Sequence, residues 1–192
     1  MTTPSAQFRW LTLANGLTLL RALLALPCAL LIAREQWTAA ALVFTIAALS
    51  DYYDGRVARA QGSSSAAGGV FDHSTDAAFV TLCLAAAAHM GLTTAILPPL
   101  IIAAFAQYAL DSRILAGHTL RGNWLGRVNG IAYFVLSGFV IGVPLLQQWF
   151  GAPLAAPLAL LQTLLPMAAL ALCVTTVLSM LNRARYWLRL RG

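Results

Sequence analysis

The sequence predicts an all-α, polytopic membrane protein: a bundle of six transmembrane helices with both termini in the cytoplasm. Of the 192 residues, 60% are hydrophobic and only 9% are charged, and the mean hydropathy is +0.77. A soluble domain carries about 25% charged residues, so a fully water-exposed surface is excluded. At about 20 residues per spanning helix, the chain holds roughly six helices. With no internal repeat or polar second domain visible, residues 1–192 are predicted to form a single transmembrane domain.

Each predicted span ends where polar or helix-breaking residues interrupt an apolar run. The polar segment 34–36 separates the first span from the second, and the Gly/Ser-rich segment 61–65 separates the second from the third. Segment 90–94 ends the third span, segment 117–123 precedes the fifth, and segment 151–153 precedes the sixth. The resulting spans are 14–33, 38–60, 69–90, 94–116, 125–148 and 154–181.

The positions of the arginines predict the orientation. All twelve basic residues are arginines, and with the N-terminus inside, Arg34 alone falls on the outer side. Because loops that stay in the cytoplasm are enriched in Lys and Arg, we expect both termini there, in a bacterial inner (cytoplasmic) membrane. Arg21 interrupts the first apolar run, so this run is not expected to be a cleaved signal peptide. No nucleic-acid partner is expected.

Four of the six acidic residues lie close together in the sequence. Asp51 and Asp54 are three residues apart near the end of the second span, and Asp72 and Asp76 are four apart near the start of the third. Each pair therefore shares one helix face, and antiparallel neighbouring helices would bring the pairs together. Carboxylates inside a membrane are costly without a counter-charge. Hard divalent cations, Mg²⁺ or Mn²⁺, fit such an oxygen cage, and two of them would suit transfer at phosphorus.

The residues between the acids also favour a phosphate-bearing substrate. Arg59, one turn beyond Asp54, can contact phosphate oxygens, and Ser65 precedes a helix N-terminus, which attracts anions. Small residues keep the helix surfaces slim, which suits either close helix packing or a bound headgroup. These residues are Gly55, Ala58, Gly62, Gly68 and Gly69.

The whole pattern resembles the signature of a known family. One segment resembles the signature of the class I CDP-alcohol phosphatidyltransferases at each fixed position and spacing. This segment is Asp51-x2-Asp54-Gly55-x2-Ala58-Arg59-x8-Gly68-x3-Asp72-x3-Asp76. A looser match, residues 15–21, resembles the family's sequence at the start of its first helix.

The resemblance implies a phospholipid-synthesis enzyme. Such an enzyme moves a phosphatidyl group from CDP-diacylglycerol to a small polar alcohol, releases CMP and commonly forms homodimers in membrane lipid. It implies two divalent cations, with Asp51 and Asp72 contacting both, Asp54 one and Asp76 the other. Asp76 would also be the general base that takes the proton of the acceptor alcohol. The implied CDP-lipid contacts are Asn15, Gly16, Leu17, Thr18, Gly55, Ala58, Arg59, Ser65 and Gly68.

The acceptor leaves alternatives open. Arg113, Arg121 and Arg127 could bind an acceptor that carries phosphate, or could serve only the positive-inside topology. Phe71-Asp72-His73 resembles a stretch of the choline and ethanolamine phosphotransferases, whose acceptor is diacylglycerol. A small cation transporter is the non-enzyme alternative, but the acids lie at one edge and not at the midplane. Helical periodicity places His73 away from its two acidic neighbours, where we expect a hydrogen bond or a headgroup contact and not a metal bond.

Overall fold

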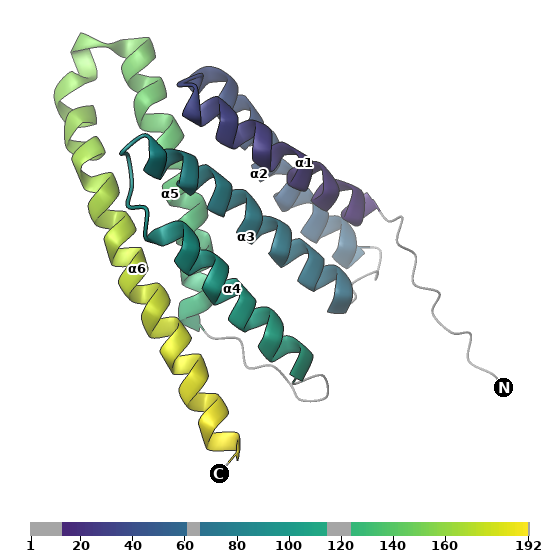
Figure 1. Ribbon diagram of the computed structural model, residues 1–192. Coiled ribbons are helices and arrows are strands. Elements are labelled where there is room, and N and C mark those ends of the chain that lie inside the picture. Colours follow the sequence, from purple (N-terminus) through teal and green to yellow (C-terminus); the bar gives the residue numbers. More distant parts are fainter. Residues whose placement is uncertain (1–12, 61–65, 115–123, 192) are drawn as a thin grey trace.

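The computed structural model describes residues 13–60, 66–114 and 124–191, and within them it shows helices and no β-strand. The all-α prediction is thereby confirmed (Figure 1). The elements are α1 (Leu13–Ala33), α2 (Trp37–Ala60), α3 (Ala66–His89), α4 (Leu97–Ile114), α5 (Trp124–Phe150), the single-turn 3₁₀ helix η1 (Ala152–Leu154) and α6 (Ala155–Arg191).

Most helix ends lie within three residues of the predicted ones, with one exception. α6 continues to Arg191, ten residues past the predicted end of the sixth span at 181. The extra segment contains no proline and no glycine before residue 192, so nothing in it stops the helix when the apolar run ends. α4 begins at Leu97 instead of residue 94, and Pro98 and Pro99 then occupy its first turn. Helices accept proline there because the first N–H groups have no intrahelical partner.

Two helices end in a left-handed residue at the same end of the bundle. Gly91, with φ of 74°, closes α3, where the N–H of Leu92 donates to the carbonyl of Ala87 at 2.9 Å. Glu35, with φ of 56°, closes α1 through the same pattern, with the N–H of Gln36 donating to Leu31 at 2.9 Å. Glycine adopts this conformation without strain, whereas a side chain does so at a cost of roughly 1–2 kcal/mol.

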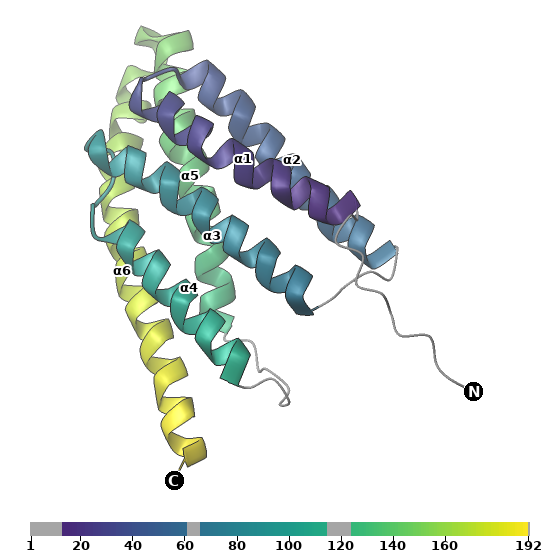
Figure 2. The same ribbon diagram turned by 45° about the vertical axis from the view of Figure 1, so that its right-hand side comes forward.

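Helix α1 lies between α2 and α3 and packs extensively against both (Figures 1 and 2). α5 packs against α6, α2 and α3, while α4 lies against α3 and α6. The start of α1 and the end of α6 both point away from the end that carries the α1–α2 and α5–α6 turns (Figure 1). The shared core consists of small and apolar side chains, among them Cys28, Ile32, Phe79, Leu84 and Val140.

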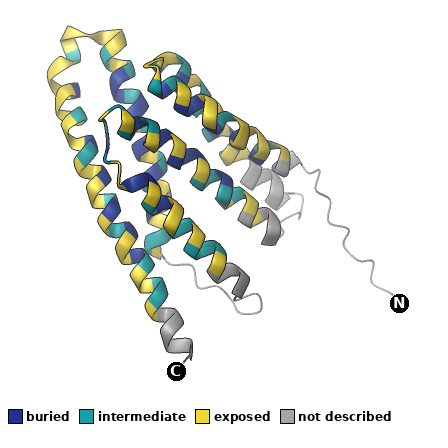
Figure 3. Ribbon diagram, viewed as in Figure 1, coloured by how far each residue is buried: buried dark blue, intermediate teal, exposed yellow. Residues whose placement is uncertain are grey.

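The outer surface of the bundle is apolar. Buried residues line the contacts between helices, and exposed positions follow the outer faces (Figure 3). Many of these exposed side chains are large hydrophobic ones, such as Leu23, Leu42 and Leu160, which suits contact with lipid tails. Within the described residues, three segments are long and apolar enough to cross a membrane, namely Gly16–Ala33, Trp124–Phe150 and Ala152–Arg185. The protein is therefore an integral membrane protein.

Candidate active site

A buried arginine joins aspartates from two helices. Arg21 of α1 places Nη1 at 3.0 Å from Oδ1 of Asp51 in α2 and Nη2 at 3.2 Å from Oδ1 of Asp72 in α3. Its Nη1 also donates to Oδ1 of Asp76, one turn further along α3. The two acidic helices thus meet chiefly through α1, and the three carboxylates converge on one guanidinium.

The exposure of these side chains shows which way the site faces. Arg21 is completely buried, whereas the side chains of Asp51, Asp72 and Asp76 are 48%, 31% and 39% exposed. The guanidinium therefore forms the floor of the site, and the carboxylates above it are accessible to a ligand. Each of the three contacts uses Oδ1, and a carboxylate has a second oxygen that can bind a cation.

The helix faces follow the spacing of the acids. Asp72 and Asp76 are one turn apart on α3 and both reach Arg21, as the four-residue spacing predicts. Asp54 belongs to α2, but its side chain lies outside the described residues. Asp51, Asp72 and Asp76 do come together, but the expectation that α2 and α3 are neighbours is wrong, because in the described part of the chain α1 lies between them.

The prediction that His73 faces away from the acids is wrong. One ring nitrogen of His73 and one carboxylate oxygen each of Asp72 and Asp76 lie within 4.8 Å of one another. The physical reason is that His73 and Asp76 are three residues apart, a spacing that puts side chains on one side of a helix. His73 is exposed, and its ring centroid lies 5.7 Å from that of Tyr108 in α4.

The chemistry of this donor set fits a hard divalent cation. Carboxylate oxygens and one imidazole nitrogen come together, and within the described residues no cysteine belongs to this group. Mg²⁺ and Mn²⁺ prefer such oxygen-rich sites. The three described carboxylates and the guanidinium carry two excess negative charges, which a divalent cation offsets. The described residues therefore fit a hard divalent cation.

The predicted CDP-lipid contacts in α1 lie beside the site. Thr18 is buried one turn before Arg21 on the same side of α1, and Leu17 is half-buried. Gly16 is exposed, and a Cβ added there would meet nothing within 4 Å. Asn15 belongs to α1, but its side chain lies outside the described residues. The α1 segment next to Arg21 therefore leaves open space around Gly16.

The remaining predicted residues are described only in part. Arg127 is exposed near the start of α5. Ser65 and Arg121 lie outside the described residues. For the others the helix is known and the side chain is not: Gly55, Ala58 and Arg59 in α2, Gly68 in α3 and Arg113 in α4.

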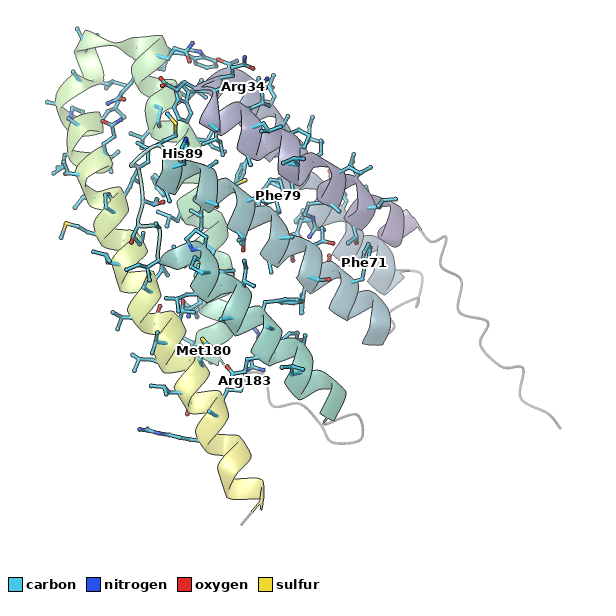
Figure 4. The ribbon with its side chains drawn as sticks, in the orientation of Figure 1. Arg34, Phe71, Phe79, His89, Met180 and Arg183 are labelled. Atoms are coloured by element: carbon cyan, nitrogen blue, oxygen red, sulfur yellow. The ribbon has the colours of Figure 1, made fainter. Side chains whose placement is uncertain are left out.

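The sequence pointed to the acids but not to three residues near them. Arg21 was available as a signal, because a charge within an apolar span generally pairs with another group inside the bundle. Tyr108 carried no signal. Arg183 of α6 places its guanidinium carbon 5.2 Å from the centroid of the Tyr108 ring. Figure 4 shows Arg183 and Phe71 in the half of the bundle away from Arg34 and His89.

The comparison with known families agrees with this geometry. The sequence model described as CDP-alcohol phosphatidyltransferase matches residues 11–188, a range that contains Arg21 and all four aspartates. A search of curated proteins finds no match.

Proposed function

Because the chain belongs to the CDP-alcohol phosphatidyltransferase family and is an integral membrane enzyme, we propose that it synthesises phospholipid from CDP-diacylglycerol. In the proposed reaction a phosphatidyl group moves to a small polar alcohol and CMP is released. The observation that carries the proposal is the convergence of Asp51, Asp72 and Asp76 from α2 and α3 on one accessible site. Within a membrane such a cluster of acids marks a functional site.

We assign the cation ligands to Asp51, Asp54, Asp72 and Asp76. Two bound Mg²⁺ or Mn²⁺ ions would offset the charge of the reacting phosphates and hold them in line for displacement. The exposed sides of the carboxylates leave room for this arrangement. We place the nucleotide diphosphate against the segment 15–18 of α1, because Gly16 leaves open space there. Gly55, Ala58, Arg59, Ser65 and Gly68 complete the proposed CDP-lipid contacts.

Asp76 is the proposed general base. Its carboxylate takes the proton of the acceptor hydroxyl, and the acceptor oxygen attacks the β-phosphorus of the donor. The bond between that phosphorus and the oxygen bridging to CMP breaks, and the electron pair leaves with CMP. Nη1 of Arg21 contacts Oδ1 of Asp76, which holds this carboxylate in place and leaves its second oxygen for the acceptor proton.

The acceptor is proposed as a small polar alcohol, with Arg113, Arg121 and Arg127 as its candidate contacts. Arg127 is exposed near the start of α5, where it is accessible to a water-soluble molecule. Arginine suits a phosphate on the acceptor because its planar fork can hold two phosphate oxygens.

We further propose a cytoplasmic active site in a bacterial inner membrane and a homodimeric assembly. Arg34 lies at the end of the bundle that carries the α1–α2 turn (Figure 4), and positive-inside topology assigns that end to the outside. The dimer rests on the family alone, and light scattering of the purified protein measures it.

The proposed function is tested by CMP release from CDP-diacylglycerol in detergent, with Mg²⁺ or Mn²⁺ and a panel of acceptors. The panel contains glycerol 3-phosphate, inositol phosphate and unphosphorylated alcohols. A reversed arm offers diacylglycerol with CDP-choline or CDP-ethanolamine. We expect divalent-dependent CMP release with one polar alcohol. Turnover only in the reversed arm would make CDP-choline or CDP-ethanolamine the donor in place of CDP-diacylglycerol. No turnover with any pair, together with cation flux into proteoliposomes, would refute the transferase assignment.

A further inference from the structure

We propose that Arg21 is a positioning residue, a fixed counter-ion that holds the carboxylates of Asp51, Asp72 and Asp76 at the spacing the cations require. The proposal starts from the placement of the guanidinium. Arg21 is completely buried, and between residues 17 and 25 of α1 the other residues are apolar except Thr18. A buried charge is tolerated only when opposite charges satisfy it, and here three carboxylates from two other helices do so.

The geometry gives the guanidinium a task that packing alone would not require. Nη1 contacts both Asp51 and Asp76, while Nη2 contacts Asp72. One planar group therefore determines the relative positions of a carboxylate on α2 and two on α3. Since α1 packs extensively against both of those helices, the position of Arg21 within α1 sets the distance between the two halves of the cluster.

The charges explain why a counter-ion is needed at this place. Three carboxylates drawn to one point repel one another strongly inside a protein, where charges are screened less than in water. Their half-exposed sides face outward, whereas their inner sides face Arg21. The guanidinium thus offsets one charge from the buried side and leaves the outer side for divalent cations.

The first test is a double-mutant cycle on thermal stability in detergent with excess chelator. We expect Arg21→Gln to lower the apparent Tm by about 10 °C, because it leaves partly buried carboxylates without their counter-ion. The decisive quantity is the effect of Asp51→Asn. The shift in apparent Tm caused by Asp51→Asn should be several degrees more favourable in the Arg21→Gln background than in the wild type. In the Arg21→Gln background this substitution removes repulsion between carboxylates and breaks no ion pair.

The control cycle combines Arg21→Gln with Glu35→Gln, which removes an acid at the other end of α1. Effects in that cycle should add. Additive effects of Arg21→Gln and Asp51→Asn would overturn the proposal. If Arg21→Gln yields no folded protein, the cycle is run with Arg21→Lys, which keeps the charge but cannot present the same fork, and additivity there overturns the proposal equally.

The second test adds Mn²⁺ to the same proteins and rests on the proposed metal site. We expect Mn²⁺ to raise the apparent Tm of Arg21→Gln less than that of the wild type, because without the guanidinium the three carboxylates no longer keep the spacing that the cations require. Arg34→Gln changes the arginine in the turn that follows α1. The apparent Tm of this variant should respond to Mn²⁺ as that of the wild type does. An equal Mn²⁺ response in Arg21→Gln and wild type would reduce Arg21 to a packing role. The cycle in chelator needs no metal or substrate, so its failure is distinct from failure of the proposed function.

Discussion

At the residue scale, Asp76 differs from the other acids in its expected task. Asp76→Asn keeps the shape of the side chain but removes its capacity to accept a proton. We expect kcat to fall by roughly 10²–10⁴-fold, while binding of CDP-diacylglycerol is largely retained. Turnover assays and binding of a fluorescent CDP-lipid measure the two effects. Glu35→Gln is the matched control, since Glu35 lies in the turn between α1 and α2, and it should leave both values unchanged. Loss of binding in Asp76→Asn would instead make this residue an essential metal ligand.

Asp51 and Asp72 should act through the cations. An amide oxygen is a weaker ligand for Mg²⁺ than a carboxylate, so Asp51→Asn and Asp72→Asn should raise the Mg²⁺ concentration for half-maximal activity by about tenfold or more. They should also weaken metal-dependent binding of the donor. Titration of activity with Mg²⁺ and with Mn²⁺ tests both expectations. A wild-type metal requirement in both variants would contradict the shared-ion assignment.

At the scale of the helices, the left-handed residue that ends α3 provides a stability test. Added Cβ atoms at Gly91 and at Gly142 would both meet nothing within 4 Å, but only Gly91 has a positive φ, 74°. Gly91→Ala should therefore destabilise the protein by about 1 kcal/mol, and Gly142→Ala should not. Thermal unfolding in detergent compares the two variants. Equal Tm values would show that the end of α3 relaxes without cost.

The helices also show where local signals are sufficient. The end of α1 at 33 and that of α2 at 60 were predicted to the residue, because the polar segments that follow break the apolar runs. The end of α6 was missed by ten residues, since hydropathy reports where a helix leaves an apolar environment and not where its hydrogen bonding stops.

At the scale of the whole molecule, the arrangement predicts a sidedness that can be measured. Gln36 lies in the turn between α1 and α2, and Arg185 lies near the end of α6, in the opposite half of the bundle. Both residues are exposed. A membrane-impermeant maleimide should label Gln36→Cys in right-side-out vesicles and Arg185→Cys only in inverted ones. The wild type is the control, because Cys28, Cys83 and Cys173 are buried. The opposite labelling pattern would invert the topology and move the active site to the outer face.

The sequence by itself determined the class, the family and the acids of the site. Length, low charge and apolar runs predict six helices because a span must be apolar over about 20 residues. The spacing of Asp51, Asp54, Asp72 and Asp76 predicts two acidic faces because a helix repeats every 3.6 residues.

The tertiary structure decided how those faces meet. Helix α1 lies between α2 and α3, and no periodicity within one helix can report which third helix separates two others. That placement brings Arg21 under Asp51, Asp72 and Asp76 and sets Tyr108 between His73 and Arg183. These contacts join residues up to 75 positions apart in the chain, because only the packing of whole helices brings such distant positions together.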